Sequence, residues 1–243
     1  METPGRLGRT LLLGTVIIVA SAVAGCTTTV VGSAEAAGPG PSSSHSTGAP
    51  STSTPSVPPK VPGWQVVVAD KAGVAYDVPP DWKVQSPDAI VGYEDAQGNP
   101  GASMNYAAIY KEGYCTGHSG SFRGETGITS TSTADPGQAA SALAQQWATG
   151  SYSDGTVTPN VTPGAPQPIT VAGTNGMVVK DTLTMTQQNP CDPPAGEVYA
   201  VALPLAAPNT GCDVMIVMAD QGTSDAAPDQ ELQQIINSLR LTS

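Results

Sequence analysis

EVYAVALPL (197–205) and CDVMIVMAD (212–220) are two apolar stretches separated by a short segment that contains Pro and Gly. Runs of this length that are rich in Val and Ile and bounded by turn residues are typical of buried strands. Because the connection is too short for a crossover, we expect the two stretches to form an antiparallel hairpin.

The segments before this hairpin extend the same pattern toward the N-terminus. QPITV and GMVVKDTLTM flank the turn residues AGTN, which predicts a second hairpin. All the connections that can be recognised between strands are short, so the sheet should be mainly antiparallel. The further expected strands are 64–69, 73–78, 89–95, 102–110, 167–171 and 176–185.

Two helices are expected beside the sheet. Asp135 can cap the free amides of a helix that begins at Pro136, and a second helix should begin at Pro228. Apolar residues recur in both at i, i+3, i+4 and i+7: Ala140, Leu143, Ala144 and Trp147, then Leu232, Ile235, Ile236 and Leu239. The fold class is therefore predicted to be α+β, a mainly antiparallel sheet covered by two amphipathic helices.

Three stretches resemble a known fold family. GVAYDVPPDWKV (73–84) resembles the opening of the Mog1/PsbP-like fold, in which a strand pair leads into a Pro-Trp turn. VMIVMAD (214–220) and LQQIINSLRL (232–241) resemble its close. Residues 64–242 as a whole look like an extracellular domain of unknown function found in actinobacterial surface lipoproteins. The resemblance implies no activity, and the prolines and Trp of the first motif are interpreted as packing residues.

The first 25 residues have the pattern of an export signal. Arg6 and Arg9 precede the apolar run LLLGTVIIVASAVA (11–24), which is too short to span a bilayer as a helix. The run ends in VAGC at Cys26, which resembles the lipobox of bacterial lipoproteins. We therefore expect residues 1–25 to be removed, and the Cys26 thiol to carry the lipid, with acyl chains such as palmitate. A cysteine inside an N-terminal membrane helix is the weaker alternative, because the apolar run stops at Cys26.

Residues 26–62 consist mostly of Ser, Thr, Pro, Gly and Ala. Such a segment buries too little apolar surface to offset its conformational entropy, so it is interpreted as a disordered linker. The sequence thus predicts a signal peptide (1–25), a lipidated linker (26–62) and an extracellular domain (63–243). The product would be a protein anchored at the extracellular face of the cell membrane.

The formal net charge of the chain is -11. An acidic chain repels phosphate backbones and anionic lipid headgroups, so nucleic-acid binding is not expected. The membrane is expected as a partner only through the lipid on Cys26. An envelope protein or a cell-wall component remains open as a further partner.

Three cysteines remain after Cys26, and export favours their oxidation. Cys191 and Cys212 lie at opposite ends of the expected 197–205/212–220 hairpin, which separates them by too much for a bond. We therefore expect a disulfide between Cys115 and Cys191. Cys212 would then be buried and inert, or available for an intermolecular bond. A zinc site with His118 as the fourth ligand is the alternative.

Enzyme motifs are mostly absent from the sequence. His118 in CTGHSGS (115–121) is adjacent to Ser119, but no orienting acid is evident, so no catalytic residue is assigned. The acidic stretches Glu94-Asp95 and 220–229 are interpreted as solvated turns and a helix start rather than calcium sites. No metal and no cofactor are expected.

The sequence leaves three hypotheses for function. The first is a non-enzymatic accessory or binding module at the cell envelope. The second is a carrier of an apolar envelope ligand, which would need a large dry pocket between the sheet and the helices. The third is an envelope hydrolase that uses His118, which would need a polar cleft converging on that residue or on paired carboxylates.

Overall fold

The computed structural model describes residues 57–94, 99–116, 120–153, 158–187 and 191–242. The elements in this part of the chain are β1 (Gln65–Ala69), η1 (Asp70–Ala72), β2 (Val74–Val78), β3 (Trp82–Val84), β4 (Val91–Glu94), β5 (Pro100–Tyr110), β6 (Gly124–Thr131), α1 (Pro136–Gly150), β7 (Asn160–Thr162), β8 (Gln167–Val171), β9 (Thr174–Thr184), β10 (Ala195–Pro204), β11 (Cys212–Gln221), α2 (Asp229–Ser238) and β12 (Arg240–Leu241).

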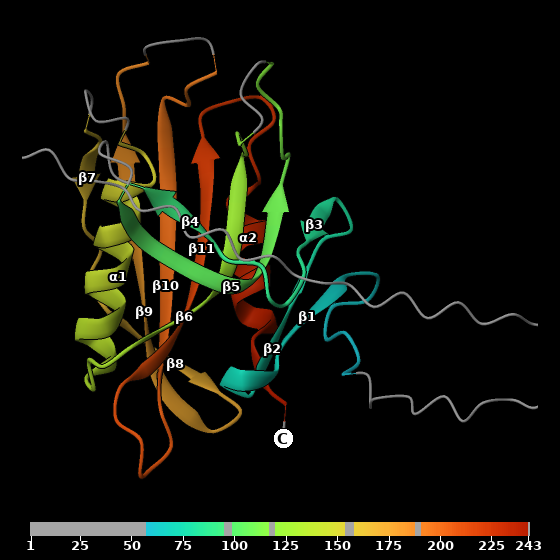
Figure 1. Ribbon diagram of the computed structural model, residues 1–243, viewed down its shortest axis with the longest axis vertical. Coiled ribbons are helices and arrows are strands. Elements are labelled where there is room, and N and C mark those ends of the chain that lie inside the picture. The colour runs from blue at the N-terminus through green and yellow to red at the C-terminus, as the bar shows by residue number, and fades with distance from the viewer. Residues whose placement is uncertain (1–56, 95–98, 117–119, 154–157, 188–190, 243) are drawn as a thin grey trace, which may run out of the picture. The chain divides into compact units, whose positions relative to one another are not determined.

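The principal sheet runs in the order β3-β5-β6-β11-β10-β9-β7, with β4 paired to β5 and β8 paired to β9. Each of these pairings is antiparallel. The long strands stand side by side in Figure 1, with α1 at one side of the sheet and α2 behind it. The α+β prediction, with a mainly antiparallel sheet and two packed helices, is confirmed.

The hairpin expected at 197–205 and 212–220 is formed by β10 and β11. The two strands pair without interruption from Ala195 opposite Gln221 to Pro204 opposite Cys212. Successive side chains along a strand point to opposite faces, so this hairpin contributes to both faces of the sheet. It occupies the middle of the sheet, which explains why apolar residues fill both faces without polar alternation.

The two helices cover opposite faces of this sheet, and each face has its own core. The core beneath α1 contains Ala140, Trp147, Val198, Ile216 and Met218. The other core contains residues of α2, of the edge strand β3, of the central strands and of the small sheet β1-β2-β12: Tyr76, Trp82, Val201, Met215, Val217, Leu232 and Ile235. The helical face predicted for each helix is thus the face that packs on the sheet.

The helix starts agree with the sequence. The Asp135 side chain accepts a hydrogen bond of 2.8 Å from the Gln138 amide, and Pro136 occupies the first turn of α1. The second helix, α2, begins at Asp229, directly after Pro228. No helix among the described residues is long and apolar enough to cross a membrane.

Strand β6 was not expected from the sequence, which placed a loop between residue 110 and Asp135. It lies between β5 and β11, near the middle of the sheet. Its sequence, GETGITST, has one large apolar residue, Ile128, so periodicity carries no signal for a buried strand. Its burial comes from its two neighbouring strands rather than from its own hydrophobicity.

Asp77 fastens the N-terminal segment of the described chain to the C-terminal strand. Its carboxylate is fully buried, and Oδ2 accepts hydrogen bonds from the backbone amides of Lys60 (2.6 Å) and Val61 (2.8 Å). Oδ1 lies 2.8 Å from Nη1 of Arg240, whose Nη2 donates to the Pro58 carbonyl. Residues 58–61, assigned to the linker on composition, therefore contact the domain directly.

Candidate functional site

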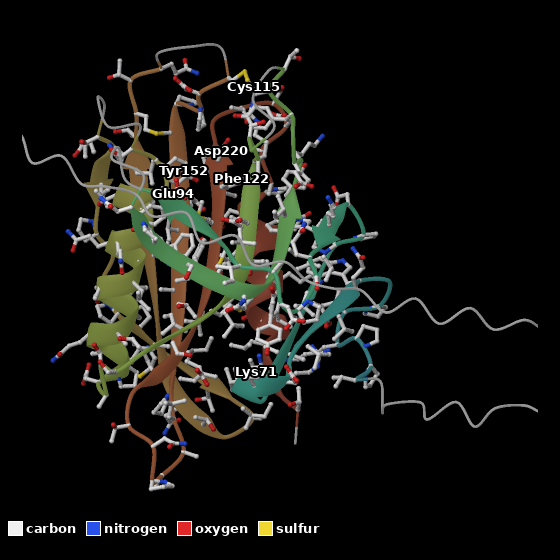
Figure 2. All side chains as sticks on the ribbon, in the orientation of Figure 1. Lys71, Glu94, Cys115, Phe122, Tyr152 and Asp220 are labelled. Carbon is white, nitrogen blue, oxygen red and sulfur yellow. A yellow bond between two sulfur atoms is a disulfide. The ribbon has the colours of Figure 1, made fainter. Side chains whose placement is uncertain are left out.

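A pocket of about 270 Å³ opens at the end of the sheet where β10 begins and β11 ends. Its walls come from the loop after β5, the end of α1, the segments on either side of residues 188–190, and β11. The lining includes Tyr114, Phe122, Tyr152, Met185, Met218 and Asp220. Figure 2 shows Phe122, Tyr152 and Asp220 gathered at the same end of the sheet as Cys115, with Lys71 at the other end.

A disulfide joins two walls of this pocket. Cys115 and Cys191 are bonded, with their Cα atoms 5.7 Å apart, as predicted. The neighbouring Tyr114 lines the pocket, and its hydroxyl donates a hydrogen bond of 2.5 Å to the Cys191 carbonyl. The bond therefore fixes the loop after β5 against the segment that leads into β10.

The disulfide also decides between the alternatives for the cysteines. Two of the three thiols proposed as zinc ligands are consumed by the bond, and the described residues contain no group of three His, Cys, Asp or Glu side chains placed to hold a metal. Cys212 is buried at the far end of β11, where its Sγ lies 3.8 Å from the Ala134 carbonyl. This position fits the inert role proposed for it.

Arg123 occupies the centre of a charged cluster beside the pocket. Its Nη1 lies 2.9 Å from Oδ2 of Asp220 and its Nε lies 3.1 Å from Oδ1 of Asp225. The guanidinium stacks over the Tyr114 ring, 3.7 Å from the ring centroid. Cation–π contact and two carboxylates together compensate the charge of a side chain that is almost fully buried.

Asp220 is the carboxylate that reaches both this cluster and the pocket. It is 5% exposed, and the Tyr152 hydroxyl donates a hydrogen bond to it. Burial raises the pKa of Asp220 to about 7, and the hydrogen bonds from Arg123 and Tyr152 offset this effect only in part. The protonation of Asp220 therefore changes near neutral pH. The interpretation of residues 220–229 as solvated is wrong for this residue.

Glu125 is a second buried carboxylate on the same face of the sheet. It lies on β6 directly opposite Met218, which lines the pocket, and it is 2% exposed. Its Oε1 has no hydrogen-bond partner among the described residues. Burial raises the pKa of Glu125 to about 8, because desolvation penalises the ionised form.

Gly196 makes room for Tyr152. It lies on β10 opposite Asp220, and a Cβ atom at this position would come within 2.8 Å of Cζ of the Tyr152 ring. A side chain there would push the ring away from the sheet. Glycine inside a strand is normally unfavourable, so this close approach accounts for its presence.

The structure brings Cys115 and Cys191 together as the sequence predicted, whereas Cys26 and His118 lie outside the described residues. Arg123, Glu125 and Tyr152 were not singled out from the sequence. Arg123 and Glu125 were missed because strand β6 and the residue before it were taken for a loop. Their alternate spacing is a signal that both charges share one face of a strand.

The family described as "Domain of unknown function (DUF8017)" matches residues 57–243. No curated protein matches the chain. The match includes every described element and every residue of the pocket. The chain therefore belongs to the family of domains of unknown function DUF8017.

Proposed function

We propose that the chain is a lipoprotein anchored by lipid on Cys26 at the extracellular face of the cell membrane, and that its domain is a non-enzymatic module that binds a small ligand. Support for the anchor comes from the sequence of residues 1–26. Support for binding comes from the pocket beside the disulfide.

The pocket has the features of a ligand site built on rigid elements. About 270 Å³ is close to the lower end of the range for small-molecule sites. Aromatic and methionine side chains form most of its apolar lining, and Asp220 supplies a buried polar group. Because the disulfide and the ends of β10 and β11 hold its walls, a ligand would meet a preformed surface.

The binding hypothesis fits the pocket better than the two alternatives do. A catalytic carboxylate must be within reach of a reacting proton, whereas Asp220 is already bonded to Arg123 and Tyr152. A carrier of an apolar ligand needs room between sheet and helix. The apolar space near Val74, Leu203 and Leu239 has a volume of about 10 Å³, about the least that one water needs.

The proposed relationship to the Mog1/PsbP-like fold rests on the turn between β2 and β3. Trp82, which follows the two prolines, is buried and donates a hydrogen bond of 2.9 Å from Nε1 to Oε1 of Glu231 in α2. The Pro-Trp turn therefore connects the small sheet, β3 and α2. This contact supports a packing role for the motif.

Gly120→Trp should close the pocket and abolish ligand binding. Gly120 lines the pocket, and a Cβ atom there would meet nothing within 4 Å, so a large side chain can be accepted without displacing the backbone. Thermal-shift screening of the full chain against a mixed panel of cationic, neutral and anionic small molecules identifies ligands. Their stabilising effect should disappear in Gly120→Trp and persist in Gly120→Ala. If no stabilising compound distinguishes the two variants, the pocket is not a ligand site.

Cys26→Ser should release the protein from the membrane, because serine cannot form the thioether that carries the lipid. The measurement is fractionation of cells followed by a high-salt wash of the membranes. The wild-type protein should remain in the membrane fraction and the variant should not. A variant that stays with the washed membranes would show that another segment provides the anchor.

A further inference from the structure

We propose that the ligand of this pocket carries a positive charge on an organic ammonium group. The inference rests on the proposed binding function and adds the chemical class of the ligand. Three observations lead to it: the aromatic and sulfur-containing walls, the charges around the pocket, and its size.

The walls of the pocket are suited to an organic cation. Tyr114, Phe122 and Tyr152 supply aromatic rings, and Met185 and Met218 supply polarizable sulfur atoms. Aromatic faces attract ammonium groups through their quadrupoles, most strongly where water is excluded. The guanidinium of Arg123, 3.7 Å from the centroid of the Tyr114 ring, already shows this type of contact at the edge of the pocket.

The two charged side chains in the described lining of the pocket are both acidic. Asp192 and Asp220 are in its lining, and no Lys, Arg or His occurs among the described residues that line it. Among the described residues, Arg123 is a cation beside the pocket, and it is paired with both Asp220 and Asp225. An anionic ligand would therefore be repelled, whereas a cation would be attracted.

The size of the pocket limits the ligand to a small head group. A volume of about 270 Å³ admits a group such as trimethylammonium with a short chain, but not a folded polymer segment. Ser151 adds a buried hydroxyl to the lining, and its Oγ has no hydrogen-bond partner among the described residues.

Choline and 3,3-dimethylbutanol provide a direct test, because they have nearly the same shape and differ in charge. The full chain is purified in a maltoside detergent, which carries no choline group of its own, and binding is followed by calorimetry and ligand-observed NMR. Choline should bind at least about tenfold more tightly than the neutral alcohol, the ratio expected when cation–π and carboxylate attraction act together.

Two variants assign the effect to the pocket. Phe122→Leu removes a ring but keeps an apolar side chain, and Asp192→Asn removes a charge but keeps the shape. Each should weaken choline binding by about threefold to tenfold and leave the weak binding of the alcohol nearly unchanged. Asp88→Asn is the control. Asp88 is exposed, and its charge acts on Tyr106, which lines a different pocket.

The outcomes separate this inference from the proposed function. If the alcohol binds as tightly as choline, or if only neutral or anionic panel compounds respond to Gly120→Trp, the pocket binds a ligand but the cation inference is wrong. If no compound of any charge responds to Gly120→Trp, both are wrong. Choline binding that Phe122→Leu, Asp192→Asn and Gly120→Trp all leave unchanged would also overturn the inference.

Discussion

Glu125→Gln is expected to raise the unfolding free energy, relative to wild type, by much more at pH 8 than at pH 5. Glu125 is buried without a hydrogen-bond partner for Oε1 among the described residues, and its pKa is raised from 4.5 to about 8. Above pH 4.5 the unfolded chain releases this proton while the folded chain keeps it. The wild-type protein therefore loses stability as the pH rises from about 4.5 to 8.

The magnitude follows from the two pKa values. A carboxyl group with a pKa of about 8 in the folded state and 4.5 in the unfolded state costs about 4 kcal/mol at pH 8 and less than about 1 kcal/mol at pH 5. Glutamine does not titrate, so the difference in unfolding free energy between pH 5 and pH 8 should shrink by about 3 kcal/mol. Asp220, whose pKa is also raised, leaves a smaller dependence of the same sign in the variant.

Denaturant unfolding of the full chain at both pH values provides the measurement. Glu112→Gln is the matched control, because Glu112 is exposed and pairs with the exposed Lys83 at the surface. Comparing each variant with wild type across the two pH values removes any constant cost of the new amide. An unchanged pH dependence in Glu125→Gln would show that Glu125 is ionised in the folded protein.

Reduction of the disulfide, or Cys115→Ser, is expected to cost about 4 kcal/mol of unfolding free energy. The bond joins residues separated by 76 positions in the sequence, and the chain-entropy model gives about this value for a loop of that length. A typical domain has an unfolding free energy of roughly 5 to 15 kcal/mol, so the bond would supply a large share of the total. The loss of the bond should also loosen the pocket, because Tyr114 is held next to Cys115 and bonds to the Cys191 carbonyl.

Thermal unfolding with and without reductant measures this effect. Wild-type protein and Cys212→Ser should both lose stability when reductant is added, because Cys212 is free. Cys115→Ser should be unaffected by reductant. Peptide mapping without reduction should recover a linked peptide containing Cys115 and Cys191. A peptide linked through Cys212, or three free thiols, would contradict the assignment.

The parts of the fold that could be predicted are those whose own sequence carries a signal. The β10–β11 hairpin has long apolar runs, and α1 and α2 have helical periodicity with recognisable starts. Strand β6 carries no such signal, because Glu125 and Thr126 are among its buried residues and its neighbours provide the burial. The pattern of apolar residues in a segment indicates what that segment contributes to the core. It does not indicate whether neighbouring strands bury the segment.

The same distinction holds for the site. The Cys115–Cys191 bond could be predicted because the expected export would favour oxidation and the hairpin separates Cys191 from Cys212. The pocket could not be predicted, because its residues come from segments far apart in sequence. Tyr152 follows the end of α1 and meets Asp220 only after the sheet has formed. The reason for a glycine at position 196 is the close approach of the Tyr152 ring, which only the structure shows.

The contacts of Asp77 determine how mechanical load enters the domain. A pull on the chain before Pro58 is borne by the bonds of Asp77 to the Lys60 and Val61 amides and by the contact of Arg240 with the Pro58 carbonyl. Because Asp77 belongs to β2 and Arg240 to β12, the force is divided between two strands of the small sheet. The load would therefore reach the small sheet before the central sheet, which carries the pocket.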